Sequence, residues 1–263
     1  GMKILKNVAW GIITARGGSK SIPLKNIVPV CGKPLIYYNI NAAKKAKTVN
    51  RIICSTDSRK IADVAKSYGA EILERPGSLG GDLVPSINVM LNVAETLYEK
   101  EGALAEILLL LQPTSIFLTS GQIDATVNAL IDNPEAKSSQ GVVKVPHQFH
   151  AHNQRVLYDN DKYIQFVYED QRDDIINAKE ITSITTEESY EEWKGFSKQT
   201  KPVHFTYGNL IVTRTKSLIE DRIFFGKPSI PIIVPLNNAY DLDTQEDIKL
   251  AELMIKNKLV EID

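Results

Sequence analysis

The chain has 263 residues, of which 43% are hydrophobic and 24% charged, the balance of an ordinary globular protein. Lysine and arginine (31) nearly equal aspartate and glutamate (32), and the net charge of −1 argues against nucleic-acid binding through bulk positive charge. The longest apolar run, Ile107–Leu111, is far shorter than the ~20 residues of a membrane span. Cys31 and Cys54 lack metal or CxxC spacing, which favours core thiols in a reducing cytoplasm.

The first 145 residues alternate between strand and helix patterns. Short apolar runs without in–out alternation predict strands buried on both faces. These runs are Val8–Thr14, Arg51–Ser55, Ile107–Leu111 and Gly141–Val145. Helical spacing fills the intervals, at Leu35–Lys47, Ser58–Tyr68, Ile87–Tyr98 and Ile123–Ile131. The alternation predicts right-handed βαβ units in a three-layer α/β sandwich with a mostly parallel sheet.

This alternation stops at Pro146. Residues 147–206 are polar and rich in Asp, Glu, Lys and Tyr, with only short apolar pieces. The α/β pattern then resumes with strands at Asn209–Thr213 and Ile230–Pro235 and a helix from Thr244 to about Lys256. We therefore predict one α/β domain from 2–146 and 207–263, with 147–206 inserted as an arm or small subdomain.

A loop rich in glycine and positive charge, Ala15–Asn26, follows the first predicted strand. It contains two glycines, two serines and the cations Arg16, Lys20 and Lys25. Glycines let backbone N–H groups turn toward an anion, and the cations add full charges. The loop therefore predicts phosphate binding at the carboxyl end of the strand, with a solvated surface loop as the alternative. Neither P-loop nor GxGxxG spacing is present.

The sequence ARGGSKSIPLKN at 15–26 resembles the opening signature of the acylneuraminate (CMP-sialic acid) and CMP-Kdo synthetases. Other motifs follow in the order of that family: NINAA at 39–43, STD at 55–57, Arg75-Pro76, Asp82–Ser86, LLQPTS at 110–115 and DLDT at 241–244. The resemblance implies a nucleotide-diphospho-sugar transferase (glycosyltransferase-A-like) fold. It also implies a homodimer in which the inserted arm forms the dimer contact and part of the acceptor side.

The resemblance also implies roles on the nucleotide side. Arg16 and Lys25 would neutralise charge on the phosphates, with Asp243 as the third catalytic residue. The other nucleotide-binding residues would be Ala15, Gly17, Lys20, Asn26, Arg75 and Ser86. Three of the matched polar residues have a structural alternative: Ser86 could cap a helix beside Pro85, Asp57 could cap the helix that begins near Ser58, and Gln112 could be a loop amide.

Asp241 and Asp243 are predicted to bind a divalent cation, Mg²⁺. They lie two residues apart just after a predicted strand, and residues i and i+2 of an extended segment point the same way. Two carboxylates on one side can hold a hard cation. The alternative is that Asp243 or Thr244 only caps the following helix. Asp247, inside that helix, is expected to contribute a little stability and no chemistry.

The acceptor side departs from the family pattern. The resemblance assigns Gln112, Lys198, Gln199 and Asn209 to acceptor binding. Ile116–Leu118 replaces an expected Pro-Leu-Arg, Val212 stands where a tyrosine is expected, and an extra segment spans about 173–195. These departures leave the identity of the sugar acid open, with nonulosonates other than common sialic acid, such as legionaminic or pseudaminic acid, among the candidates. For the HxxHxH run at 147–152, a contact with the sugar is favoured over a transition-metal site.

The function that these residues imply is transfer of CMP from CTP to a 2-keto-3-deoxy sugar acid, with release of pyrophosphate. The partners would be CTP and a sialic acid or related nonulosonate, without nucleic acid or membrane. Two alternatives stay open: a nucleotidyltransferase that uses a sugar 1-phosphate and another nucleotide, and a non-catalytic protein that binds a nucleotide sugar.

Overall fold

The computed structural model describes residues 2–19, 21–80, 85–168 and 203–263. The predictions for Lys20, Lys198, Gln199 and the extra segment therefore lie outside the described residues. The chain divides into two compact units, 1–143 with 207–263 and 144–206. The second unit begins three residues before the predicted arm, because the pairing of strand β7 (Ser138–Lys144) with its parallel neighbour ends at Val142.

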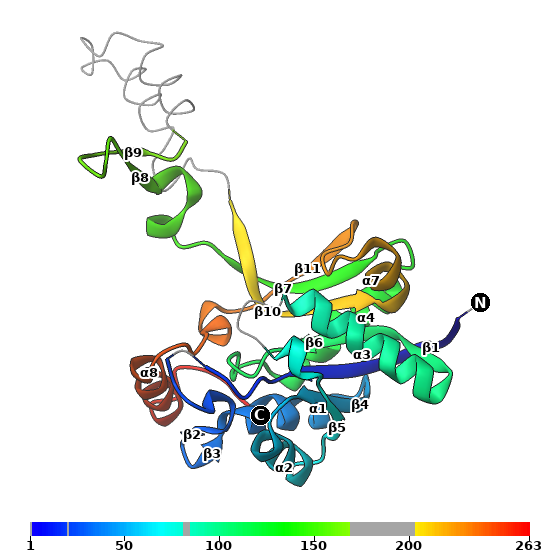
Figure 1. Cartoon of the computed structure of the whole chain (residues 1–263). Helices are drawn as coiled ribbons and strands as arrows, with labels where there is room; N and C mark the ends of the chain where they lie inside the picture. Colours follow the sequence, from blue (N-terminus) through cyan, green and yellow to red (C-terminus); the bar gives the residue numbers. More distant parts are fainter. Residues whose placement is uncertain (1, 20, 81–84, 169–202) are drawn as a thin grey trace, which may run out of the picture. The chain divides into compact units, whose positions relative to one another are not determined.

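A seven-stranded sheet forms the middle of the first unit, in the order β11-β7-β10-β6-β1-β4-β5 (Figure 1). Its other strands are β1 (Lys3–Thr14), β4 (Val49–Thr56), β5 (Glu71–Glu74), β6 (Ala103–Leu111), β10 (Phe205–Arg214) and β11 (Ser229–Ile233). β1 runs parallel to both β4 and β6, and β5 and β11 are parallel to their neighbours β4 and β7. β10 is antiparallel to β6, so the sheet is mostly parallel, as predicted.

Helices cover both faces of this sheet and complete the predicted three-layer α/β sandwich. They are α1 (Leu35–Lys45), α2 (Arg59–Ser67), α3 (Ser86–Glu101), α4 (Ser120–Asp132), α7 (Thr215–Asp221) and α8 (Gln245–Lys256). Successive strand residues point to opposite faces. In β1, Ile13 joins the core that contains residues of α1, α2 and α4, whereas Ile12 joins the core that contains residues of α3 and α7. The unbroken apolar runs thus reflect burial on both faces.

A third apolar cluster fixes the segment that carries the predicted metal ligands. Leu242 is fully buried against Leu35, Phe117 and Ile248. The small pair β2 (Pro29–Val30) and β3 (Lys33–Pro34) adds Val30 to this cluster. The backbone N–H of Leu242 donates to the carbonyl of Thr114 at 3.1 Å, which ties the segment to the end of β6.

The described part of the second unit, considered by itself, contains two short 3-10 turns and a hairpin. The turns are η3 (His147–Phe149) and η4 (Ala151–Asn153), and the hairpin joins β8 (Arg155–Tyr158) to β9 (Tyr163–Phe166). Leu157 pairs with Ile164, and both side chains are more than half exposed. The described hairpin therefore leaves apolar side chains uncovered within its own unit.

None of the helices in the described part of the chain combines the length and apolar character needed to cross a bilayer.

Candidate active site

The predicted phosphate loop begins where β1 ends and is held in place at several points. The backbone N–H of Ala15 donates to the carbonyl of Ser55 at 3.0 Å, and that of Gly17 donates to Oδ1 of Asp57 at 2.7 Å. Further along, the hydroxyl of Ser21 donates to the carbonyl of Asp243 at 2.9 Å. The loop is therefore anchored both to the end of β4 and to the segment before α8.

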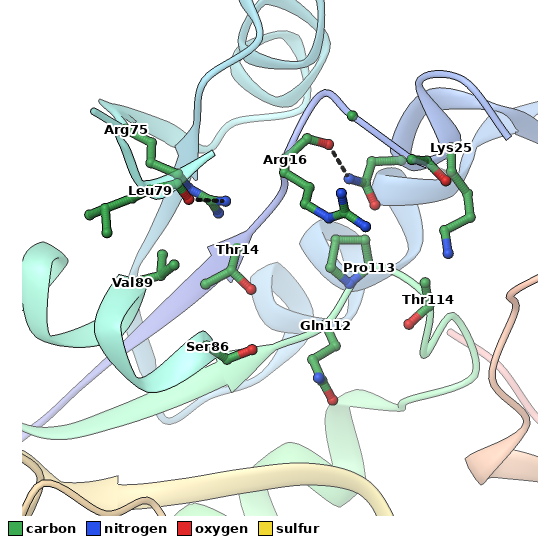
Figure 2. Close-up of a pocket in the computed structure, with 13 residues that line it drawn as sticks. Thr14, Arg16, Lys25, Arg75, Leu79, Ser86, Val89, Gln112, Pro113 and Thr114 are labelled. Carbon is green, nitrogen blue, oxygen red and sulfur yellow. Dashed lines mark hydrogen bonds between the residues drawn. The ribbon is translucent and has the colours of Figure 1, made fainter. Parts of the chain in front are cut away.

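A pocket of about 260 Å³ opens beside this loop (Figure 2). It lies at the carboxyl ends of β1 and β6, which contribute Thr14 and the residues just beyond Leu111, and α3 closes another side. The described lining residues are Thr14, Arg16, Gly18, Ser19, Lys25, Asn26, Arg75, Leu79, Ser86, Val89, Gln112, Pro113 and Thr114. These include three cationic side chains and no carboxylate, so the pocket suits a polyanion.

The pocket brings together six of the predicted site residues. Arg16, Lys25, Asn26, Arg75, Ser86 and Gln112 all line it. Ala15 and Gly17 belong to the loop without lining the pocket, and Ala15 is fully buried. Asn26 is nearly buried, and its amide donates to the carbonyl of Arg16 at 3.0 Å, so this side chain also shapes the loop.

Arg75 is almost completely buried at the edge of the pocket. Its guanidinium donates to the carbonyl of Ser55 at 3.2 Å and to the hydroxyl of the same residue at 3.4 Å. Burial lowers the pKa of Arg75, while the nearby Asp57 carboxylate acts in the opposite direction. Arg75 therefore presents its charge from a fixed position, because its donors are held by β4.

Asp57 does not cap the helix that follows it. The cap of α2 is Ser58, whose hydroxyl accepts from the N–H of Ile61 at 3.3 Å. Asp57 instead accepts from Gly17 and contributes to the electrostatic environment of Arg75. It also lies so close to Gly80 that a Cβ added there would be 2.4 Å from Oδ2 of Asp57. Asp57 thus connects the phosphate loop to the turn after β5.

Gly80→Ala is expected to raise the KM for nucleotide about tenfold and to lower the melting temperature by a few degrees, because the new methyl group displaces the Asp57 carboxylate from Gly17. Gly77→Ala is the matched control, since a Cβ there meets nothing within 4 Å. Steady-state kinetics and thermal unfolding of both variants measure the difference. Equal behaviour of the two variants would contradict the proposed connection.

Ser86 is free of the capping role considered for it. The N-cap of α3 is Pro85, which forms no side-chain cap hydrogen bond, and Ser86 is the first residue of the helix. The hydroxyl of Ser86 points toward the pocket in Figure 2 and lies near the amino end of α3. Helix N-termini favour negative charge, so this wall suits an anionic or polar group.

Gln112 follows β6 and is held by a tyrosine that sequence reasoning missed. The hydroxyl of Tyr207 on β10 donates to Oε1 of Gln112 at 3.2 Å. Burial, together with the charge of Asp241, raises the pKa of Tyr207, which keeps the phenol protonated. The position where a tyrosine was expected, Val212, is fully buried in the sheet. The only sequence signal for Tyr207 was an aromatic residue near the start of the resumed strand pattern.

Asp241 and Asp243 are both exposed residues and flank the buried Leu242, which is the alternation that the predicted cation site requires. Oδ1 of Asp243 lies 3.6 Å from Nζ of Lys25. Partial enclosure of the Asp241 carboxyl and repulsion from Asp243 raise the pKa of Asp241, against a lowering contribution from a Thr114 hydrogen bond. Although Asp241 as a residue is exposed, its carboxyl group faces the protein, and this burial is the largest cause of its raised pKa.

The helix after this pair is capped by other residues. Thr244 is the N-cap of α8 and forms a capping box with Asp247. Oδ2 of Asp247 accepts from the backbone N–H groups of Asp243 and Thr244 at 2.8 and 3.0 Å, and Oδ1 accepts from the hydroxyl of Tyr240 at 2.9 Å. Capping by Thr244, one branch of the alternative, is therefore confirmed, whereas Asp243 is not the N-cap; Asp247 holds the backbone of the Asp243 segment.

Two other groups of predicted residues lie elsewhere. Asn209 is buried on β10, and its amide donates to Oε1 of Gln122 on α4 at 2.9 Å, so it links the sheet to that helix and does not line the pocket. In the second unit, His150 stacks on His204 with ring centroids 4.2 Å apart, and His152 lies 5.1 Å from His150. Among the described residues, no group of three His, Cys, Asp or Glu side chains could hold a metal ion.

The fold and the pocket define an α/β protein with a cationic pocket at the carboxyl edge of its sheet, the edge where such sheets bind ligands. A family profile described as cytidylyltransferase matches residues 10–211, and the chain belongs to this family.

Two relatives and one solved structure match nearly the whole chain. The pseudaminic acid cytidylyltransferase of Campylobacter jejuni is 25% identical over 96% of this chain and 97% of its own. The CMP-N,N'-diacetyllegionaminic acid synthase of Legionella pneumophila is 26% identical over 93% and 95%. The structure of a CMP:2-keto-3-deoxy-manno-octonic acid synthetase complexed with CTP shares the fold, with a TM-score of 0.62 at 13% identity, over 95% of this chain and 99% of that one.

Proposed function

We propose that this cytidylyltransferase activates a nonulosonic acid, a 2-keto-3-deoxy sugar acid, by transferring CMP to it from CTP. The observation that carries the proposal is the pocket, whose described lining has three cationic side chains and no carboxylate. The Asp241–Asp243 pair lies beside it, with Oδ1 of Asp243 3.6 Å from Nζ of Lys25. The names of the two relatives, which act on pseudaminic and legionaminic acids, support the acceptor class.

In the proposed reaction the anomeric hydroxyl of the sugar acid attacks the α-phosphorus of CTP. A new P–O bond to the sugar forms, the bond to the β-phosphate oxygen breaks, pyrophosphate leaves, and the hydroxyl proton passes to solvent or a phosphate oxygen. Arg16 and Lys25 stabilise the charge that develops on the departing phosphates. Ser86 and the fixed charge of Arg75 hold the nucleotide, and Gln112 contacts the acceptor from the end of β6. Positioning and charge neutralisation provide the catalysis, without a covalent enzyme intermediate.

The donor set of Asp241 and Asp243 fits a hard divalent cation. Burial and, to a lesser extent, the charge of Asp243 raise the pKa of Asp241, and a bound cation would offset both effects. Two carboxylates with the remaining positions open to water and phosphate oxygens are typical of Mg²⁺ sites. When bound, the cation would neutralise phosphate charge and favour deprotonation of the attacking hydroxyl.

A panel of substrates tests this function. We expect pyrophosphate release with CTP, Mg²⁺ and at least one of pseudaminic, N,N'-diacetyllegionaminic and N-acetylneuraminic acids. Equal or faster turnover with UTP, GTP or ATP and a sugar 1-phosphate would favour the alternative nucleotidyltransferase. Nucleotide-sugar binding without pyrophosphate release under any of these conditions would favour a non-catalytic protein.

We also propose that the chain acts as a homodimer joined through the segment 147–206. The support is the hairpin of the second unit, which leaves Val156, Leu157 and Ile164 45–63% exposed. Exposed apolar patches of this kind mark protein contacts. Light scattering should give twice the chain mass at micromolar concentration, and Leu157→Lys with Ile164→Lys should give one chain mass with an unchanged far-ultraviolet spectrum. A single-chain mass for the unaltered protein would contradict the dimer.

A further inference from the structure

Tyr207 lies behind the pocket and not in its wall. It belongs to β10, which runs antiparallel to β6 with Ile211 opposite Leu110. This register carries Tyr207 past the end of β6 to the level of the residues that follow Leu111. Its ring packs edge-to-face on Phe225 with centroids 5.8 Å apart, and it adjoins the apolar cluster that contains Leu110 and Ile211. The direction of the phenol is therefore set by packing on two sides.

In the structure the Gln112 amide turns its Oε1 end toward the hydroxyl of Tyr207. A glutamine amide has an acceptor oxygen at one end and two N–H donors at the other. The hydroxyl of Tyr207 donates to Oε1 at 3.2 Å, which directs the oxygen toward β10. The Nε2 donors are then available to the pocket that Gln112 lines.

We propose that Tyr207 is a positioning residue that holds Gln112 as a hydrogen-bond donor toward the acceptor. The site therefore selects a sugar acid that presents an acceptor oxygen, such as a carboxylate oxygen, to the Nε2 group of Gln112. This inference rests on the proposed function. Its physical basis is that a hydrogen-bonded amide loses its freedom to flip before substrate arrives, so less entropy is lost on binding. The residues that stand where the family has Pro-Leu-Arg offer no polar contact to the acceptor. They are Ile116–Leu118, and all three are buried in apolar clusters.

Tyr207→Phe is the test, because it removes the hydroxyl and keeps the ring. We expect the KM for the most active sugar acid of the panel to rise about tenfold, with the KM for CTP changed less than twofold. Tyr38→Phe is the matched control: it removes another partly buried hydroxyl, which donates to the carbonyl of Val30 outside the pocket lining. It should leave both KM values unchanged.

A double-mutant cycle separates positioning from general destabilisation. If Tyr207 acts through Gln112, Tyr207→Phe should have little further effect on the acceptor KM in a Gln112→Ala background. Fully additive effects, or a parallel rise in the KM for CTP, would overturn the inference. An unchanged acceptor KM in Tyr207→Phe, in an enzyme whose unaltered form is active, would overturn it while leaving the proposed function intact.

A spectroscopic measurement tests the pair without turnover. The side-chain amide signals of Gln112, assigned by their loss in Gln112→Glu, should shift in Tyr207→Phe and stay in place in Tyr38→Phe. If the unaltered protein released no pyrophosphate with any acid of the panel, the proposed function would fail. An unshifted Gln112 amide in Tyr207→Phe would overturn the positioning role.

Discussion

Asp243→Asn should reduce pyrophosphate release about 10²–10³-fold while the fold survives. The side chain of Asp243 is 68% exposed, and its Oδ1 lies 3.6 Å from Nζ of Lys25. Asparagine keeps the shape but removes the charge that would hold a cation. The measurement is a Mg²⁺ titration of pyrophosphate release, together with calorimetric titration of Mn²⁺ in the presence of CTP.

Two neighbouring substitutions serve as comparisons. Asp241→Asn should impair turnover less and raise the Mg²⁺ requirement, since one charged ligand remains. Asp247→Asn keeps an oxygen that can accept from the backbone of Asp243 and Thr244, so it should cost about 0.5–2 kcal/mol of stability and change kcat little. Near-normal turnover in Asp243→Asn, or a selective kinetic loss in Asp247→Asn, would contradict this assignment of the cation site.

Lys25→Gln should lower kcat about 10²-fold with a smaller change in the KM for the sugar acid. The side chain of Lys25 is only 18% exposed, lines the pocket and faces the Asp243 carboxylate. Its ammonium group is therefore placed where charge develops on the leaving phosphates, and glutamine cannot supply that charge.

Lys33→Gln is the control for the loss of a lysine charge. Lys33 is exposed, lies 5.2 Å from the ring centroid of Tyr37 and does not line the pocket. Single-turnover measurements with saturating CTP separate the chemical step from binding. If Lys25→Gln and Lys33→Gln had the same kcat as the unaltered enzyme, Lys25 would have no part in charge stabilisation.

Strand β5 and the long β1 illustrate the limits of the sequence pattern. Glu71–Glu74 was not predicted as a strand, because four residues ending in charged side chains give little periodic signal. β1 starts at Lys3 and not at Val8, because its first residues are partly exposed and the apolar run marks only the part buried on both faces. α1 ends at Lys45, two residues before the predicted end.

The sequence by itself determined the fold class and the composition of the phosphate loop. Strands buried on both faces need unbroken apolar runs, and a loop that binds an anion needs glycines and cations; both requirements act locally and are visible in the order of residues. The sequence also predicted the Asp241–Asp243 pair, since alternation along an extended segment places i and i+2 together; their role as cation ligands stays a prediction.

Only the tertiary structure decided the roles of Asp57, Asn209 and Tyr207. Asp57 accepts from Gly17 and approaches Gly80, contacts made by segments far apart in the chain. The amide of Asn209 donates a hydrogen bond to Oε1 of Gln122 on α4. Tyr207 reaches Gln112 across 95 residues because β10 lies antiparallel beside β6. Such pairings depend on strand order and register, which the packing of the whole sheet sets and no local pattern records.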